Sequence, residues 1–343
     1  MERTAGITSN TVPWEILRAA GYAPRLLEAE PGATPHADRF MEDVFDRRIR
    51  VIFDRLCAGA WKHDVVVIPR TSEQEHNLYL YLREAARLGV MDPGPHLYLY
   101  NLLHTRTPES YQYGLERTQE MVADFGASED GLRGAIDEGN RARSAIRDVL
   151  RLRHEGRLEG STAIRLIQGF YASDRAQFTN QVTKVLEQGL TEQPVSRSRI
   201  LIKGAPLHHT ALHCLIEQIG GYVVAEDDWR GSRAAGETNI ATDRDPVTAI
   251  FEKYFYDAVS PRVHPPEVAD GWFHQEVARS RVDGVVFYIP LEDDVVGWDY
   301  PRHLAFVESR KVPSTVVRSD GAPEPTTELV QQVASFIRSL GGN

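Results

Sequence analysis

Six short runs of apolar, mostly β-branched residues recur along the chain, and polar or turn-forming residues bound each of them. They are 64–69 (DVVVIP), 96–103 (HLYLYNLL), 199–206 (RILIKGAP), 222–228 (YVVAEDD), 284–290 (GVVFYIP) and 314–320 (STVVRSD). Continuous apolar runs without alternation are typical of parallel strands that are covered on both faces. Amphipathic helical patterns follow the first and third runs, so the sequence predicts an α/β fold.

The middle of the chain has a different pattern. From about 109 to 188 the apolar spacing is helical and no run indicates a strand, and 189–199 (GLTEQPVSRSR) is polar, as expected of a linker. We therefore predict an N-terminal α/β domain over 1–108, a helical segment over 109–190 and a C-terminal α/β domain over 191–343. Each α/β domain is expected to be a Rossmann-like or flavodoxin-like parallel sheet.

Composition limits the compartment and the partners. The 343 residues carry 39 Lys+Arg against 49 Asp+Glu, a net charge of −10, which gives no overall positive potential for nucleic acid. The polar start lacks the features of a signal peptide, and the apolar runs are far shorter than the ~18 residues of a membrane span. We predict a cytoplasmic protein without nucleic-acid or membrane partners. Its two cysteines, Cys57 and Cys214, exclude a disulfide framework and a self-contained four-cysteine metal site.

Polar residues at the ends of predicted strands are the candidate site residues, because open parallel sheets bind ligands beyond the carboxyl ends of their strands. The candidates are Ser72, Glu73, Gly204, His208 and the acidic triplet 292–294, which contains Asp293. Gly204 would allow close approach of the backbone. Structural alternatives stand beside them: Ser72 as a helix N-cap, His208 as an exposed first-turn residue, and the triplet as a solvated loop.

The segment 226–233 (EDDWRGSR) also follows an apolar run. Ser232 and Arg233 are candidates for contacting a phosphate or carboxylate, whereas the alternative is that Arg233 pairs with Asp227 or Asp228 and stabilises the loop. The chain contains no GxxxxGK[ST], GxGxxG, HExxH or GxSxG motif. Its scattered histidines lack metal-ligand spacing, so no metal site is predicted from the residues alone.

Four segments, in order along the chain, carry a family resemblance. The first is 6–27 (GITSNTVPWEILRAAGYAPRLL), in which Gly6, Pro13, Glu15, Ala19, Ala20, Gly21 and Pro24 fit the family pattern. The others are 65–82 (VVVIPRTSEQEHNLYLYL), 200–207 with 216–233 (ILIKGAPL and IEQIGGYVVAEDDWRGSR) and 282–301 (VDGVVFYIPLEDDVVGWDYP). Together they resemble the 2-hydroxyacyl-CoA dehydratase D-component family, which includes benzoyl-CoA reductase subunits and has paired α/β domains with a helical insertion.

The resemblance also shows where this chain departs from the family. Active members hold a [4Fe-4S] cluster on cysteines, and the motifs place those cysteines at Ser9, Ser72 and Asp293 here. Hydroxyl and carboxylate oxygens replace soft thiolates poorly at such a cluster. The resemblance therefore implies a chain that keeps the scaffold and holds no cluster on its own cysteines.

The function implied by the resemblance is that of a partner subunit. The chain would shape an acyl-CoA site in a dehydratase or benzoyl-CoA reductase-type complex, beside a homologous subunit that bears the [4Fe-4S] cluster, or would form a homodimer. Ser9, Ser72 and Asp293 are expected to meet at one cleft between the α/β units. Two alternatives remain. One is a standalone homologue that uses these residues, with the neighbouring Glu73, Glu292 and Asp294, for a hard metal or for acid–base chemistry. The other is a binding protein without chemistry.

Overall fold

Two compact units make up the chain, and each is described by itself. The computed structural model describes residues 3–28, 32–91, 93–172, 174–188, 196–228, 233, 236, 238–257, 260–291, 293–319, 322 and 324–341. Unit 1 comprises Met1–Arg143, Tyr171–Phe178 and Gly236–Pro265. Unit 2 comprises Ser144–Phe170, Thr179–Ala235 and Pro266–Asn343.

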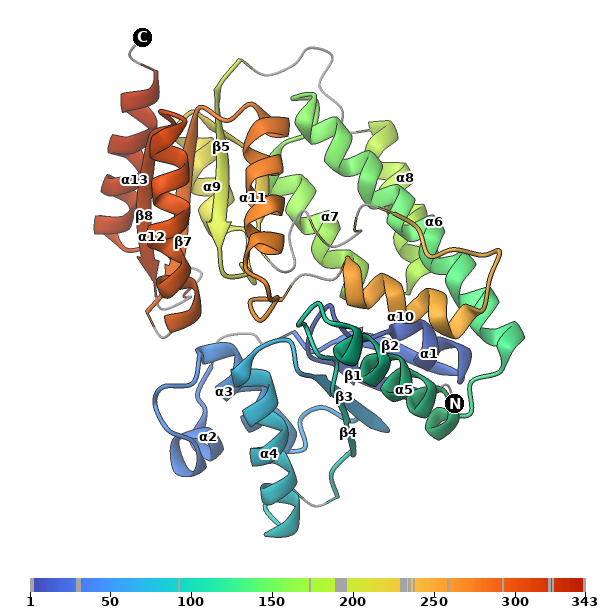
Figure 1. The fold of residues 1–343 in the computed structure, drawn as a ribbon. Helices are drawn as coiled ribbons and strands as arrows, with labels where there is room; N and C mark the ends of the chain where they lie inside the picture. The colour runs from blue at the N-terminus through green and yellow to red at the C-terminus, as the bar shows by residue number, and fades with distance from the viewer. Residues whose placement is uncertain are drawn as a thin grey trace. The chain divides into compact units, whose positions relative to one another are not determined.

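Unit 1 is an α/β unit built around a parallel sheet (Figure 1). Its elements are β1 (Arg3–Ile7), α1 (Trp14–Ala19), β2 (Tyr22–Leu26), α2 (Pro35–Phe40), α3 (Arg47–Cys57), β3 (Val65–Pro69), α4 (Glu73–Arg87), β4 (His96–Tyr100), α5 (Pro108–Phe125) and α10 (Pro246–Tyr256). The strand order is β2-β1-β3-β4, with parallel pairing throughout. This order matches the start of the flavodoxin-like arrangement.

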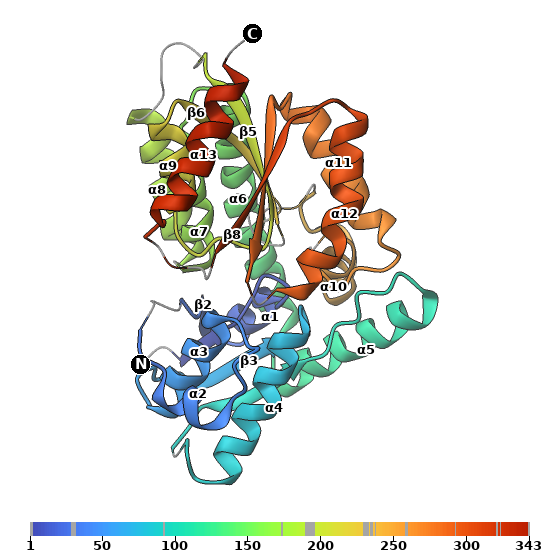
Figure 2. The same ribbon diagram turned by 90° about the vertical axis from the view of Figure 1, so that its left-hand side faces the viewer.

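Helices cover both faces of the unit 1 sheet, which explains why β3 is fully buried and reads as a continuous apolar run. Helices α3 and α4 pack on one face, and their apolar side chains form one core with Val66 and Ile68 of β3. On the other face, α1 contacts β2, α5 contacts β4, and α10 packs on α5 (Figure 2). The apolar runs at 64–69 and 96–103 thus form strands as predicted.

Strands β1 and β2 were not among the predicted strands, and their sequences explain why. The β1 residues RTAGI include an arginine and a glycine, and β2 is YAPRL, with a proline inside the strand. Proline cannot donate to a sheet ladder and is confined to edge strands, which is where β2 lies. Neither segment has the apolar run that indicated the other strands.

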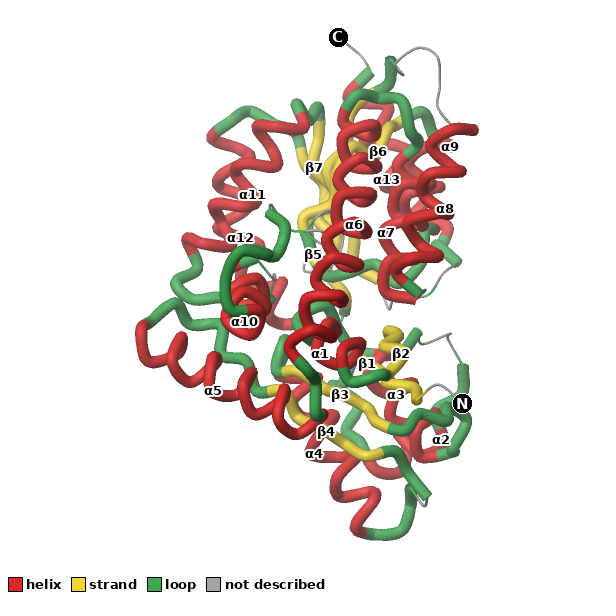
Figure 3. The backbone as a smooth tube through the Cα atoms, turned by 90° about the vertical axis from the view of Figure 1, so that its right-hand side faces the viewer, coloured by secondary structure: helices red, strands yellow, loops and turns green. Residues whose placement is uncertain are grey.

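Unit 2 repeats the architecture of unit 1 (Figure 3). Its elements are β5 (Ser198–Gly204), α9 (Ala211–Gln218), β6 (Gly221–Asp227), α11 (Glu267–Ser280), β7 (Gly284–Pro290), α12 (Asp294–Ser309), β8 (Ser314–Ser319) and α13 (Thr327–Leu340). The order is β6-β5-β7-β8, again with parallel pairing throughout. All four apolar runs predicted in this half form strands, and the predicted α/β class with two parallel sheets is confirmed.

Alternate side chains of the unit 2 strands enter two separate cores, one on each face of the sheet. Ile200 and Ile202 of β5 pack with α9 and α13, whereas Leu201 packs with α11 and with Val307 of α12. Figures 2 and 3 show the two helix pairs on opposite sides of the sheet. The apolar run of β5 is therefore continuous because both of its faces are covered.

Along the sequence, the segment between β4 and β5 is helical, as predicted. Three helices, α6 (Glu129–His154), α7 (Gly160–Ala172) and α8 (Arg175–Gln188), each carry residues of both units. The predicted domain boundaries at 108 and 190 stay a prediction. In the described part of the chain, no helix combines the length and apolar character that crossing a membrane requires.

Candidate functional site

The strand order of unit 1 creates a switch point between β1 and β3. The chain leaves β1 toward β2 on one side and returns to β3 on the other, so the loops after β1 and β3 diverge at the carboxyl edge of the sheet. Ligands of open α/β sheets bind in such crevices. Residues 8–13 follow β1 and residues 70–72 follow β3; we call this edge the unit 1 switch point.

A cluster of buried hydroxyl groups occupies the unit 1 switch point. The Ser9 and Thr71 hydroxyl oxygens lie 2.5 Å apart, and Thr11 also hydrogen-bonds to the Thr71 hydroxyl. The Ser260 hydroxyl donates to the Thr71 carbonyl at 2.6 Å. Ser9, Thr11 and Thr71 are at most 9% exposed. The structure thus places the predicted residue Ser9 against Thr71, which directly precedes the predicted residue Ser72.

Ser72 itself begins helix α4. Its hydroxyl accepts a hydrogen bond from the Glu75 backbone N–H at 3.2 Å, which is the N-cap role given above as its structural alternative. A cap and a site role are compatible here, because Ser72 follows Thr71 at the same edge. The site role of Ser72 stays a prediction.

Glu75 is the residue of this edge that the sequence analysis did not select. Its side chain is 3% exposed, and burial raises the pKa of its carboxyl, although Arg48 and the hydroxyls of Thr71 and Ser9 act in the opposite direction. The Arg48 Nη1 atom lies 3.8 Å from Glu75 Oε1. A carboxyl held toward its neutral form beside hydroxyl groups is able to donate a proton or a hydrogen bond.

A signal for Glu75 was present in the sequence. The buried residues of α4 are Glu75, Leu78, Leu82 and Ala85, whose spacing places them on one helical face. Glu75 therefore extends the apolar stripe by one turn toward the strand end. The sequence shows a charged residue on that stripe, but not that Arg48 of α3 and Ser9 of the β1 loop surround it, because tertiary packing brings these groups together.

The predicted residue Glu73 lies outside the hydroxyl cluster. Its side chain is exposed and forms an ion pair with Arg262, and its Oε2 atom lies 3.9 Å from His76 Nδ1. An exposed carboxylate paired in this way behaves as a surface ion pair. The contacts given for Glu73 are with Arg262 and His76. A catalytic role for Glu73 stays a prediction.

The unit 2 sheet has an equivalent switch point between β5 and β7, and two predicted residues lie there. Gly204 ends β5 with φ of 154°, and a Cβ on it would lie 1.8 Å from the Tyr288 carbonyl oxygen of β7. The close approach that Gly204 permits is therefore to β7. Asp293 caps helix α12, since its side chain accepts from the Val296 N–H at 3.0 Å.

Of the remaining predicted residues of unit 2, His208 and Arg233 are described. His208 is exposed between β5 and α9. Ser232 and Glu292 lie outside the described residues, and nothing is described of the Asp294 side chain. Ser9 and Ser72 belong to unit 1, whereas Asp293 belongs to unit 2, so their meeting at one cleft stays a prediction.

Arg233 is buried and forms the ion pair expected of its structural alternative. Its Nε and Nη2 atoms lie 3.1 and 3.0 Å from Asp227 Oδ1, and Lys203 Nζ lies 2.8 Å from Asp227 Oδ2. Burial raises the pKa of Asp227, but the charges of Lys203 and Arg233 outweigh it, and the pKa is lowered. Two cations thus meet the Asp227 carboxylate at the carboxyl ends of β5 and β6. An anion-binding role for Arg233 stays a prediction.

The preceding residue, Glu226, belongs to a separate buried network. Its carboxylate lies 2.7 Å from Arg153 Nη1 and 2.6 Å from His213 Nε2. Burial acts to raise the pKa of the Glu226 carboxyl. The charges and hydrogen bonds of Arg153 and His213 have the larger, opposite effect and lower it to about 2. This fully buried network ties β6 to α6 and α9, so we interpret Glu226 as a structural residue.

Neither cysteine is placed like a ligand of a cluster at the switch points. Cys57 packs in the α3–α4 core, where burial raises the pKa of its thiol to about 12, and Cys214 donates to Thr210 Oγ1 at 3.8 Å within α9. No group of three His, Cys, Asp or Glu side chains is placed to hold a metal within the part of the chain that is described. The donors at the unit 1 switch point are hydroxyl and carboxyl oxygens, which do not fit an iron–sulfur cluster.

Comparison with known proteins gives the same result as the motifs. The profile of the 2-hydroxyglutaryl-CoA dehydratase D-component family matches residues 10–340. A protein of Escherichia coli (strain K12) described as dehydratase subunit YjiM is 26% identical over 307 residues, covering 83% of this chain and 76% of that relative. The (R)-phenyllactyl-CoA dehydratase beta subunit of Clostridium sporogenes is 20% identical over 239 residues, covering 67% of this chain and 62% of the relative. The resemblance seen in the sequence is confirmed: the chain belongs to the 2-hydroxyglutaryl-CoA dehydratase D-component family.

Proposed function

We propose that this chain is the cluster-less subunit of an acyl-CoA dehydratase or benzoyl-CoA reductase-type complex. A homologous partner would carry the [4Fe-4S] cluster, and this chain would shape the acyl-CoA site beside it. Membership of the dehydratase family and the names of the two relatives, both subunits, support an assembly with another chain. A cytoplasmic location stays a prediction.

One observation carries the proposal: the hydroxyl cluster of Ser9, Thr11 and Thr71 at the unit 1 switch point. One of its members, Ser9, is at a position where the family resemblance expects a cysteine ligand, and the cluster is hydrogen-bonded within the protein. Such a site offers hydrogen-bond donors to the carbonyl or hydroxyl oxygen of an acyl thioester. Glu75, held toward its neutral form, would supply or return a proton there.

Arg233 and Lys203 are the groups that we assign to the anionic part of the ligand. Both cations lie at the Asp227 carboxylate, so a phosphate or carboxylate bound at this edge would be close to two positive charges. A guanidinium forms forked, charge-assisted hydrogen bonds with such groups. Gly204, His208 and Asp293 would border the same edge of the unit 2 sheet.

Co-purification under anaerobic conditions tests the assembly. The tagged chain is expected to bring down a homologue that has cysteines at the positions of Ser9, Ser72 and Asp293, with the iron content following that homologue. As a matched control, the homologue expressed without this chain should keep its iron but lose acyl-CoA turnover. Purification of this chain without such a homologue, from cells that express both, would contradict the proposal.

A standalone acid–base enzyme is the second candidate, and the buried Glu75 beside Ser9 and Thr71 favours it. In that case the chain alone would convert a 2-hydroxyacyl-CoA, and Glu75→Gln would abolish the conversion. If the chain alone is inactive and the two-subunit complex is active, the standalone reading is excluded. If neither turns over or binds a thioester, the chain is a binding protein of another kind.

A further inference from the structure

Arg70 is a cation at the carboxyl edge of the unit 1 sheet to which no role has been assigned. It follows β3 and directly precedes Thr71. Within the described part of the chain its guanidinium forms no ion pair, and its Nε atom is buried without a hydrogen-bond acceptor. A buried donor of this kind costs free energy for as long as it has no acceptor. The Arg70 side chain as a whole is half-buried, so a solute can still reach it.

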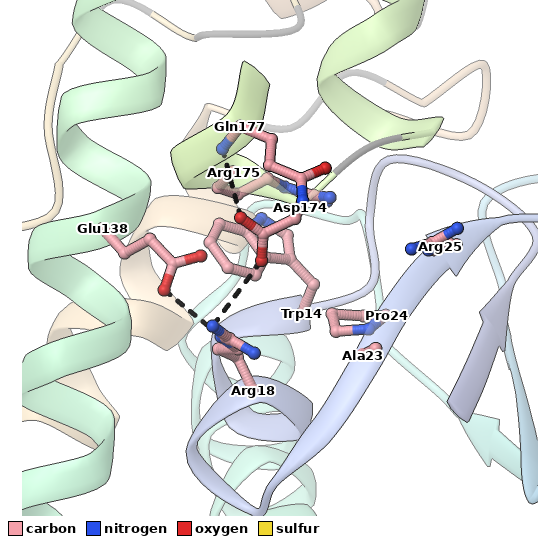
Figure 4. Close-up of a pocket in the computed structure, with 9 residues that line it drawn as sticks. All are labelled: Trp14, Arg18, Ala23, Pro24, Arg25, Glu138, Asp174, Arg175 and Gln177. Atoms are coloured by element: carbon pink, nitrogen blue, oxygen red, sulfur yellow. Dashed lines mark hydrogen bonds and ion pairs between the residues drawn. The ribbon is translucent and has the colours of Figure 1, made fainter. Parts of the chain in front are cut away.

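Arg18 shows how another half-buried arginine of unit 1 is compensated within the protein. Its Nε atom lies 3.2 Å from Glu138 Oε2 and its Nη2 atom lies 3.6 Å from Asp174 Oδ2. Figure 4 shows the Arg18 guanidinium between these two carboxylates. Arg70 lacks such a pair, so its charge is available to a group from outside the protein.

The segment between α10 and α11 brings a second cation, Arg262, to the same edge. Ser260 of this segment donates to the Thr71 carbonyl at 2.6 Å, and Arg262 forms an ion pair with Glu73. Thr71 and Glu73 follow Arg70 by one and three residues, so these contacts place Arg262 near Arg70. Burial lowers the pKa of the Arg262 guanidinium, and the positive charge of Arg70 acts in the same direction.

Two histidines beside Arg70 experience the same positive charge. Burial lowers the pKa of His76, which lies at the start of α4, and that of His104, which follows β4. The charge of Arg70 adds to this effect at both residues, and Arg106 adds to it at His104, whose pKa falls to about 3. Both imidazoles are therefore neutral at pH 7. They add no charge of their own, and the excess of positive charge belongs to the arginines.

The geometry points to a binding site for a small anion. We propose that Arg70 binds a small oxoanion, a phosphate or carboxylate group, at the start of α4, with Arg262 as the second cation of the site. Both kinds of anion match the forked donors of a guanidinium. The N-terminus of the 15-residue helix α4 carries a partial positive charge that also favours an anion there. Arg233 and Lys203, which we assign to the anionic part of an acyl-CoA, belong to unit 2, so this site goes beyond the proposed function.

Titration calorimetry of the full chain tests the proposal. Sodium phosphate and sodium acetate are titrated in separate arms against sodium chloride, at matched ionic strength because salt screens such charges. We expect saturable binding of at least one oxoanion and none of chloride, and the tighter arm identifies the ligand class. The measurement uses no acyl-CoA and no partner subunit, so its failure would leave the proposed dehydratase function intact.

Removal of the Arg70 guanidinium locates the binding. Arg70→Gln should weaken oxoanion binding about tenfold or more, as expected when charge-assisted hydrogen bonds are lost. Arg83→Gln is the matched control, because it makes the same change at an exposed arginine of α4. Arg83 lies ten residues after the first residue of α4, which is roughly 15 Å along the helix, so this variant should bind the oxoanion as the native chain does.

A second variant should change the affinity in the opposite direction. Glu73 is exposed and holds a negative charge beside Arg262, so Glu73→Gln should tighten oxoanion binding about twofold or more. Glu84→Gln, at an exposed position near the other end of α4, is its control and should have no effect. No oxoanion binding beyond that of chloride, or equal effects of Arg70→Gln and Arg83→Gln, would overturn the proposal. Unchanged or weaker binding in Glu73→Gln would overturn it as well.

Discussion

At the start of α4, Ser72 and Glu75 have the spacing of a capping box. Only Ser72 has the role that this motif predicts. Ser72 caps the helix, as the motif predicts, whereas the Glu75 carboxyl is buried near Ser9 and Thr71. The motif could be read from the sequence. The contact of Ser9 with Thr71 could not, because it joins residues 62 positions apart.

The pH dependence of stability tests the buried state of Glu75. Burial raises its folded-state pKa above the ordinary value of 4.5, so its favourable contribution is complete at low pH. That contribution is lost as the pH rises above 4.5, because the unfolded chain then ionises more readily than the folded one. Glu75→Gln should therefore gain free energy of unfolding relative to the native chain between pH 5 and 8.

Urea unfolding at several pH values measures this difference. Glu73→Gln is the matched control, because Glu73 is exposed and lies two residues away on the same helix. It should show no such gain with rising pH. Parallel stability curves for native chain and Glu75→Gln would mean that the carboxyl is ionised in the folded state.

A second prediction at the residue scale concerns Arg233. If Arg233 contacts the anionic part of an acyl-CoA, Arg233→Ala should weaken its binding by about 1.5–3 kcal/mol, the range for a charged hydrogen bond. Calorimetric titration with CoA and a panel of acyl-CoAs measures this loss in the assembled complex. Arg310→Ala, on the C-cap of α12, is the control. Unchanged affinity in Arg233→Ala would reduce Arg233 to the structural partner of Asp227.

At the scale of elements, the sequence predicted what local chemistry determines. The six apolar runs became strands because helices cover both faces of each sheet, and Ser72 marked the start of α4. Strands β1 and β2 were missed because their pairing with β3 and with each other, rather than their composition, makes them strands.

Helix capping gives a prediction that separates the two readings of Ser72. As an N-cap alone, Ser72→Ala should cost about 1 kcal/mol of the free energy of unfolding. Thr326→Ala is the matched comparison, because Thr326 caps α13 in unit 2 through the Leu329 N–H at 3.2 Å. Similar losses of stability in both variants, with loss of complex activity only in Ser72→Ala, would assign Ser72 to the site. Equal activity would leave it a cap.

Gly204 gives a prediction about the β5–β7 edge. Gly204→Ala would place a methyl group 1.8 Å from the Tyr288 carbonyl oxygen, at a φ of 154° that side chains disfavour. We expect a loss of about 3 kcal/mol or more, or failure to fold. Gly297→Ala, where a Cβ would meet no atom within 4 Å, should be tolerated. Thermal unfolding compares the two, and a stable Gly204→Ala protein would show that the strands do not approach so closely.

At the scale of the whole molecule, the chain combines the family's α/β architecture with an oxygen-lined switch point. The D-component match extends over residues 10–340, which contain the whole unit 2 sheet and strands β2, β3 and β4 of the unit 1 sheet. Ser9, Ser72 and Asp293 stand at the positions that the motifs assign to cluster ligands. The partner-subunit proposal is that the scaffold is kept here without the cluster chemistry.

Iron and acid-labile sulfide per chain, measured after anaerobic reconstitution of the purified chain alone, test this account most directly. We predict iron and sulfide far below one cluster per chain, and no cluster signal in visible or EPR spectra. Cys57→Ser with Cys214→Ser should change nothing, since one thiol is buried in a core and the other lies within α9. A stoichiometric [4Fe-4S] signal that survives in this double variant would contradict the account.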